Sequence, residues 1–235
     1  MADRASRQLI VNADDLGQSP GVNRGVAVAH DTGIVRSASV MVRWDAAPSA
    51  FRDAARSGLD LGLHLDLGEW AFEAGRWRAV YEVVDLQDES AVHAEVHYQA
   101  DVFVQLRGTA PSHVDTHQHV HRRPGIAAAA RSVADRFGVP LRDANTSARH
   151  CGAFYGQTAE GAPRPGAVSV EALVGLLADL LPGATELVCH PGLDVDLDTM
   201  YREERAVEVA TLCDERVRRA IDDLGIDLCS FAMLA

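Results

Sequence analysis

Short apolar segments alternate along the chain with longer segments whose apolar residues recur at helical spacing. The first pair is a strand predicted for 8–12 and a helix predicted for 21–32, where Val22, Val26 and Ala29 fall on one side. Further strands are predicted at 35–42, 59–65, 112–117, 139–142, 185–189 and 227–231, and further helices at 46–57, 89–106, 126–137, 170–181 and 203–224. This alternation predicts an α/β fold with a parallel sheet, either open and doubly wound or closed into a (β/α) barrel.

Two stretches, 68–88 and 144–169, lack either periodicity and are predicted to be loops. They are longer than ordinary connections in a compact domain, and loops of such length commonly cover a functional site. No internal repeat or linker divides the chain, so residues 1–235 are predicted to form a single domain.

The composition narrows the classes of function. Hydrophobic residues make up 47% and charged residues 24% of the 235 residues, which is typical of a globular protein. No long apolar segment predicts a secretory signal or a membrane span, and the four cysteines form no C-x-x-C pair, so we expect a cytoplasmic protein with reduced thiols. The net charge is 22 − 34 = −12, which disfavours nucleic acid and anionic membranes as partners and favours a neutral small molecule. A homodimer remains open.

Polar residues of metal-binding type follow several of the predicted strands. Because the carboxyl ends of parallel strands open on one face, residues distant in sequence are expected to meet there. The candidates are Asn12, Asp14 and Asp15 after the first strand, His64 and Asp66 at the third, Asp115, His117, His119 and His121 at the next, and His190 near the end. Arg142, at the end of the strand predicted for 139–142, is a further candidate contact.

Each of these segments also has a purely structural explanation. The Asp14-Asp15 pair could cap a helix, although capping needs one carboxylate and two adjacent carboxylates repel unless a cation or shared proton compensates them. His64 and Asp66 lie on the face opposite the leucines of their strand, as a site would require, but a single strand histidine is also common in cores and at surfaces.

The segment 113–121 carries four histidines and an aspartate within nine residues, and imidazole is the commonest ligand for transition metals. We expect it to be extended, with His117, His119 and His121 on one face; not all can bind one ion, since a catalytic centre takes about three protein ligands. His190 is followed by Pro191-Gly192, which stiffens the strand exit and suits a histidine that transfers protons.

Four motifs, in order, resemble those of the YdjC-like (ChbG-like) carbohydrate deacetylases: residues 9–17 (LIVNADDLG), 62–65 (GLHL), 112–121 (SHVDTHQHVH) and 189–192 (CHPG). The resemblance covers nearly the whole chain and extends to residues 20–23, Glu95, Gln99, Tyr201, Arg205 and Glu208. It implies a distorted (β/α) barrel similar to the NodB-type polysaccharide deacetylases. The segments 68–81 and 150–168 depart from the family pattern.

The resemblance further implies a divalent ion, zinc or magnesium, bound by Asp15, His64 and His117, with Asp14 as general base and His190 as general acid. By the same resemblance, the expected reaction removes an N-acetyl group from an N-acetylglucosamine-type sugar. Asn12, Asp66, Asp115, His119, His121 and Arg142 are then expected to contact the ligands or the substrate. Two alternatives stay open: a phosphoesterase or amidohydrolase with two or three metal ions, and a sugar- or metal-binding protein without turnover.

Overall fold

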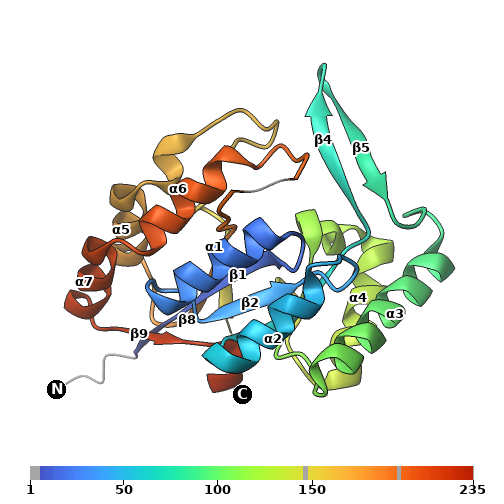
Figure 1. Cartoon of the computed structure of the whole chain (residues 1–235), viewed down its shortest axis with the longest axis horizontal. Helices are drawn as coiled ribbons and strands as arrows, with labels where there is room; N and C mark the ends of the chain where they lie inside the picture. The colour runs from blue at the N-terminus through green and yellow to red at the C-terminus, as the bar shows by residue number, and fades with distance from the viewer. Residues whose placement is uncertain (1–5, 145–147, 195–196, 235) are drawn as a thin grey trace.

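The computed structural model describes residues 6–144, 148–194 and 197–234, and its centre is a curled parallel sheet (Figure 1). The strands of this sheet are β1 (Arg7–Leu16), β2 (Ser37–Val40), β3 (Asp60–Leu65), β6 (Val114–Thr116), β7 (Ala148–Cys151), β8 (Gly183–Cys189) and β9 (Ile226–Cys229). Their order is β6-β3-β2-β1-β8-β7, and β9 pairs with the first half of β1. Because β6 and β7 stand at opposite ends of this order, the expected distorted barrel is confirmed as an open half-barrel.

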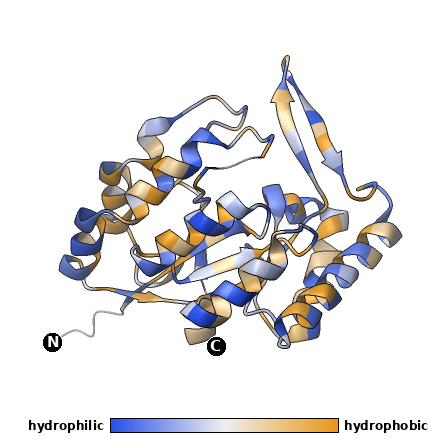
Figure 2. Ribbon diagram, viewed as in Figure 1, coloured by the Kyte–Doolittle hydropathy of each residue, from blue (hydrophilic) through white to orange (hydrophobic). Residues whose placement is uncertain are grey.

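Helices connect the strands and cover the outside of the sheet (Figure 1). They are α1 (Pro20–Asp31), α2 (Ala47–Ser57), α3 (Glu89–Arg107), α4 (Pro124–Phe137), α5 (Val170–Ala178), α6 (Glu203–Leu212) and α7 (Glu215–Asp223), with short 3-10 turns η1 (His117–Arg122), η2 (Pro165–Val168) and η3 (Phe231–Met233). Val22, Val26 and Ala29 of α1 are fully buried, as their helical spacing predicts. Figure 2 shows hydrophobic and hydrophilic residues sharing the same helices, as expected where one side of each helix packs on the sheet.

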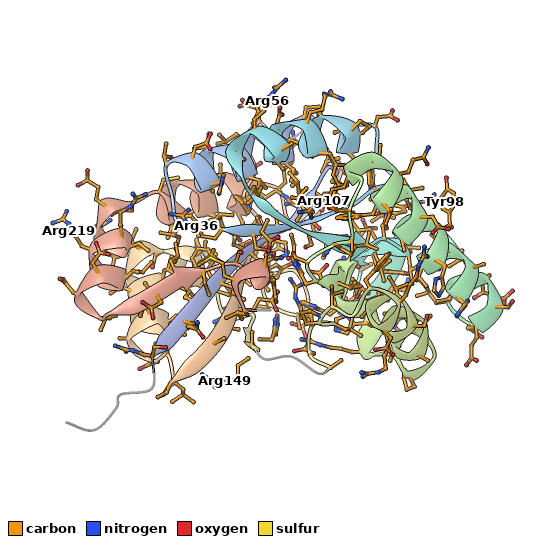
Figure 3. The ribbon with its side chains drawn as sticks, turned by 90° about the horizontal axis from the view of Figure 1, so that it is seen from below. Arg36, Arg56, Tyr98, Arg107, Arg149 and Arg219 are labelled. Carbon is orange, nitrogen blue, oxygen red and sulfur yellow. The ribbon has the colours of Figure 1, made fainter. Side chains whose placement is uncertain are left out.

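The outer surfaces of the helices are charged and polar. Figure 3 shows Arg56, Tyr98 and Arg219 projecting outward from α2, α3 and α7. Within the described residues, no helix combines the length and the apolar character needed to cross a membrane.

One of the two predicted loops contains a β-hairpin that rises from the sheet beyond β3 (Figure 1). Its strands β4 (Gly68–Glu73) and β5 (Arg76–Glu82) pair antiparallel, so the loop prediction for 68–88 was wrong over most of its length. Ala74 and Gly75 form the turn, both with positive φ (50° and 80°). Two consecutive positive φ values match the twist of the flanking strands, which makes this a favoured two-residue hairpin turn.

Three other elements differ from the sequence prediction. The segment 144–169, of which 145–147 lie outside the described residues, contains β7 and η2. The single helix expected at 203–224 is two helices, because Asp214 caps α7 by accepting a hydrogen bond from the Arg216 amide (2.8 Å). The strand expected at 139–142 is reduced to one parallel bridge between Leu141 and Val114.

The histidine-rich segment is not extended, and its prediction was wrong. Strand β6 stops at Thr116, and η1 begins at His117 with left-handed backbone angles at Gln118 (φ 49°) and His119 (φ 52°). The chain therefore turns away, and His117, His119 and His121 do not share a strand face.

A close contact fixes the segment after β8 against α1. A Cβ on Gly25 would lie 2.3 Å from the Gly192 Cα, so only glycine permits this approach. The segment that follows His190 is thereby held against α1, where the Leu193 amide also donates to the Gly21 carbonyl (2.9 Å).

Candidate functional site

A cavity of about 860 Å³ opens at the carboxyl ends of the strands. Its walls include the hairpin, η1, the segment after β7 and the segment before α6. The expected convergence of distant segments is observed, because six of the predicted site residues line this one cavity: Asp14, Asp15, His64, His117, His119 and His190. Aromatic side chains of Trp70, Trp77, Phe154, Tyr155 and Tyr201 line it as well.

A local irregularity in β1 brings both adjacent aspartates to the cavity. Successive side chains of a regular strand point to opposite faces. Between Ala13 and Leu16 the pairing of β1 with β2 shifts register, and Asp15 has a left-handed φ of 66°. Such a bulge re-aims side chains, so Asp14 and Asp15 both face the cavity.

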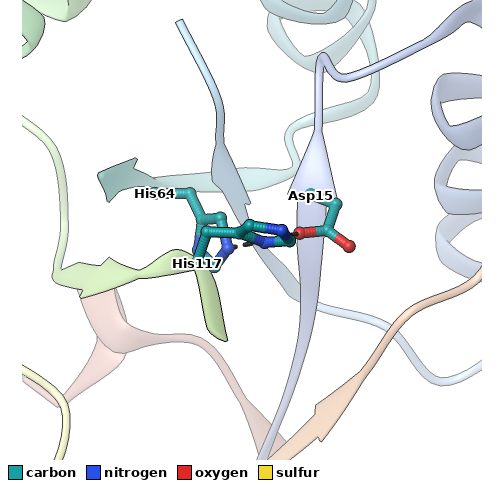
Figure 4. Close-up of side chains that lie close together, drawn as sticks. All are labelled: Asp15, His64 and His117. Carbon is teal, nitrogen blue, oxygen red and sulfur yellow. Dashed lines mark hydrogen bonds and ion pairs between the residues drawn. The ribbon is translucent and has the colours of Figure 1, made fainter. Parts of the chain in front are cut away.

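Asp15, His64 and His117 form a compact buried cluster (Figure 4). The Asp15 Oδ1 atom lies 3.2 Å from His64 Nε2 and 3.0 Å from His117 Nδ1. One ligand atom from each residue lies within 4.8 Å of the others. Two imidazoles and a carboxylate are a donor set that zinc and similar divalent ions accept, and three protein ligands leave a position for substrate or water.

Buried side chains outside the cluster hold His64 and Asp15 in position. Asp115 Oδ1 lies 2.6 Å from His64 Nδ1, which directs the Nε2 atom of that ring toward Asp15. The buried Arg205 donates to Asp15 Oδ2 (2.6 Å). Among the described residues, the His64 Nε2 atom has no hydrogen-bond partner although it is buried. A buried ring nitrogen that faces the Asp15 carboxylate without a hydrogen bond is suited to share a metal ion with that carboxylate.

The electrostatic surroundings favour positive charge at this cluster. Burial alone would lower the pKa of His64, but the carboxylates of Asp115 and Asp14 raise it well above its usual value. Burial likewise opposes a raised pKa at His117, and the Asp15 carboxylate outweighs it and raises the pKa to about 9. Both histidines thus lie in an acidic environment, which a cation would neutralise.

Asp14 is held by a buried arginine. Arg142 donates from both terminal nitrogens to the Asp14 carboxylate (2.7 and 2.8 Å), and Asn12 Nδ2 donates to Asp14 Oδ1 (2.8 Å). Burial would raise the pKa of Asp14, but Arg142 lowers it far below its usual range, so this side chain stays ionised. Arg142 also lies 2.6 Å from Asp115. It therefore acts as a positive centre between the two carboxylates.

Asp14, His64 and Asp115 form a second group of potential metal ligands. The Arg142 guanidinium already neutralises both of its carboxylates, and His64 Nδ1 is engaged with Asp115. A second ion would have to displace these contacts, so this group suits a metal less well than the first.

His190 directly follows β8, and its ring lies beside the stacked rings of Tyr155 and Tyr201. Its ring centroid is 5.4 Å from that of Tyr155 and 5.3 Å from that of Tyr201. Its backbone amide donates to Glu208 Oε2 (2.5 Å). Burial lowers the pKa of His190 to about 4, so in these surroundings the ring is neutral and carries one N–H.

Other predicted residues lie away from the cavity. Asp66 accepts hydrogen bonds from Trp44 Nε1 (3.1 Å) and Tyr81 Oη (3.0 Å), and thereby anchors the base of the hairpin. His121 Nδ1 contacts Thr116 Oγ1 (2.7 Å), and His113 stacks on Phe231 with ring centroids 3.9 Å apart. These three side chains are absent from the cavity lining.

Sequence reasoning missed several cavity residues because they lie in the two segments predicted to be loops. Glu69, Trp77, His150 and Tyr155 all line the cavity. The alternation of Trp70 and Phe72 before Ala74-Gly75 was an available signal for the hairpin. No comparable pattern marks His150 or Tyr155.

The family profile described as YdjC-like protein matches residues 8–223. The chain belongs to the YdjC-like family. It is 32% identical over 256 residues to a chitooligosaccharide deacetylase of Serratia marcescens, covering 95% of this chain and 97% of that protein. It is 28% identical over 247 residues to a carbohydrate deacetylase of Geobacillus stearothermophilus, covering 96% and 97% of the two chains.

Solved structures share the fold of this YdjC-like chain. A protein of Enterococcus faecalis, provisionally described as a cellobiose-phosphate cleavage protein, superposes with a TM-score of 0.77 at 26% identity, covering 98% of this chain and 99% of the other. A peptidoglycan N-acetylglucosamine deacetylase superposes with a TM-score of 0.58 at 12% identity, covering 97% and 87%. The second likeness supports the expected relation to polysaccharide deacetylase folds.

Proposed function

We propose that this YdjC-like protein is a metal-dependent carbohydrate N-deacetylase that hydrolyses the acetamide of an N-acetylglucosamine-type sugar. One observation carries the proposal: a buried cluster of two histidines and one aspartate lies in the same cavity as a second, ionised aspartate and a further histidine. The names of the relatives from Serratia marcescens and Geobacillus stearothermophilus support the same chemistry.

Asp15, His64 and His117 would hold one divalent ion, and the imidazole-rich donor set suits zinc, with magnesium as the alternative. A bound ion would supply Lewis-acid activation of the unreactive acetamide and of water. Asp14 would accept the proton of the attacking water at its carboxylate. His190, on the segment after β8, would act in its protonated form: the nearby carboxylates of Asp15 and Asp14 favour uptake of a proton by the ring, and the ring would pass that proton to the departing amine.

Neighbouring side chains would hold the proposed general base and metal ligands in position and contact the sugar. Arg142 and Asn12 fix the Asp14 carboxylate by three hydrogen bonds, and Asp115 fixes the His64 ring. His119 and the aromatic side chains of the cavity would contact the sugar, since aromatic faces pack on the apolar faces of sugar rings.

Acetate release from a panel of N-acetylated sugars and short chitooligosaccharides tests the function. We expect release from at least one substrate, loss of activity after removal of metal with a chelator, and recovery on adding zinc, magnesium, manganese or cobalt. Elemental analysis is expected to find one ion per chain. The absence of acetate with every pair of metal and substrate would refute the proposal, and two tightly bound ions would favour a dinuclear hydrolase.

Trp77 is predicted to strengthen the binding of longer substrates. It lies on the hairpin, lines the cavity and is 52% exposed, so its face is available to a sugar ring. Loss of a stacking aromatic costs on the order of 1 to 2 kcal/mol, so Trp77→Ala is expected to raise KM for a trisaccharide about tenfold. KM for the monosaccharide should change little.

Val80→Ala is the matched control for this prediction. Val80 lies on the same strand and is 44% exposed, but it does not line the cavity. Equal effects of Trp77→Ala on the monosaccharide and the trisaccharide would contradict a role in binding a further sugar ring.

A further inference from the structure

The base of the hairpin is joined to the turn that carries His117. The Trp70 amide donates to Gln118 Oε1 (2.9 Å), and Gln118 Nε2 donates to the Trp70 carbonyl (2.9 Å). The side chain of Gln118 thus pairs with Trp70 as a neighbouring strand would. The guanidinium of Arg123 lies over the Trp70 ring, 5.5 Å from its centroid.

This junction coincides with strained backbone. Gln118 and His119 both have left-handed φ angles, which cost free energy for residues other than glycine unless the surrounding structure compensates. The two hydrogen bonds to Trp70 supply that compensation directly after His117. The hairpin therefore helps to determine where the His117 side chain points.

Glu69, the residue before Trp70, faces the His117 ring. It is only 5% exposed, and its Oε2 atom lies 3.7 Å from His117 Nε2. Thr199 donates to its other oxygen (2.7 Å), which fixes the carboxylate. A shift of about 0.8 Å would bring Glu69 and His117 to hydrogen-bond distance.

Both histidines of the cluster lie between two carboxylates, although the outer contact is a hydrogen bond at His64 (2.6 Å) and a longer approach at His117 (3.7 Å). His64 directs Nε2 to Asp15 and Nδ1 to Asp115, whereas His117 directs Nδ1 to Asp15 and Nε2 to Glu69. Each ring therefore lies between the shared Asp15 carboxylate and a second buried carboxylate. In metal sites, an acceptor on the far nitrogen fixes the tautomer and leaves the near nitrogen free for the ion.

We propose that Glu69 is a positioning residue that holds the proton of His117 on Nε2 and so reserves Nδ1 for the metal ion. The hairpin would then contribute to the metal centre as well as to the wall of the cavity. This inference rests on the metal-dependent function proposed above, and it concerns a residue outside the three ligands.

Zinc affinity, measured by competition with a chelator, tests the role of Glu69. Glu69→Leu is expected to weaken zinc binding about 10- to 100-fold, the usual effect of losing such an outer partner. Glu69→Gln keeps an acceptor without the charge and should lie between wild type and Glu69→Leu. Glu73→Gln removes an exposed carboxylate from the same strand and should bind zinc as wild type does. Zinc affinity of Glu69→Leu within about twofold of wild type would overturn the inference.

A measurement on the wild-type protein avoids any effect of the variants on folding. NMR of the side-chain nitrogens in the zinc-loaded protein is expected to show the metal on Nδ1 of His117 and a proton on its Nε2. Zinc on Nε2 would overturn the inference while leaving the proposed function intact. Failure of the wild-type protein to bind any divalent ion would overturn both.

Discussion

His117→Ala is expected to lose the metal ion and with it essentially all deacetylase activity, whereas His121→Ala should keep both. His117 Nδ1 lies 3.0 Å from Asp15 Oδ1 inside the cluster, while His121 lies outside the cavity beside Thr116. Loss of an outer partner of a metal ligand commonly costs 10- to 100-fold in affinity, so loss of the ligand itself should exceed ~100-fold. Metal content after dialysis and acetate release measure the two effects.

His119→Ala provides an intermediate case. His119 lines the cavity but is not part of the cluster, so we expect the variant to retain metal and to lose activity to an extent that depends on the sugar. Release of the ion from His121→Ala but not from His117→Ala would show that the ligand is assigned to the wrong histidine.

The convergence of the site could be predicted from the sequence because it follows from topology. Asp15, His64 and His190 each come at or directly after the end of a strand, and the ends of parallel strands lie at one edge of the sheet. The strand periodicity that located them depends only on local residues. This part of the site needs no knowledge of side-chain contacts.

The conformation of the histidine-rich segment could not be predicted in this way. Gln118 is not a residue that normally adopts left-handed backbone angles, and no glycine or proline directly follows Thr116 to indicate that the strand ends there. The turn is held by the Gln118 side chain on Trp70, which is 48 residues away in sequence. Tertiary contacts here outweigh the local preference for an extended chain.

The contacts of Arg142 could not be predicted from the sequence either. Its predicted strand is absent, yet its guanidinium contacts Asp14, Asp115 and Glu186 from three different strands. These contacts arise because the half-barrel curls the strands around one buried point. The sequence indicates Arg142 as a candidate, but the contacts of its guanidinium depend on how the open sheet curls.

Asp14→Asn is expected to lower kcat by about 10²- to 10⁴-fold, the usual contribution of a positioned general base, while the metal ion is retained. An amide cannot accept the proton of the attacking water. Asp15, His64 and His117 do not depend on the Asp14 carboxylate for their mutual contacts. Arg142 would still contact Asp115 and Glu186, so its buried charge stays compensated. Steady-state kinetics with parallel metal analysis measure the change.

Asp53→Asn is a suitable control, because Asp53 is an exposed aspartate on α2 that pairs with Arg56 at the surface. It should leave kcat, KM and metal content unchanged. A combined loss of metal and activity in Asp14→Asn would place Asp14 in the metal centre instead of in proton transfer. Full activity of Asp14→Asn with one bound ion would refute its role as general base, and the base would then have to be sought among the other polar residues of the cavity.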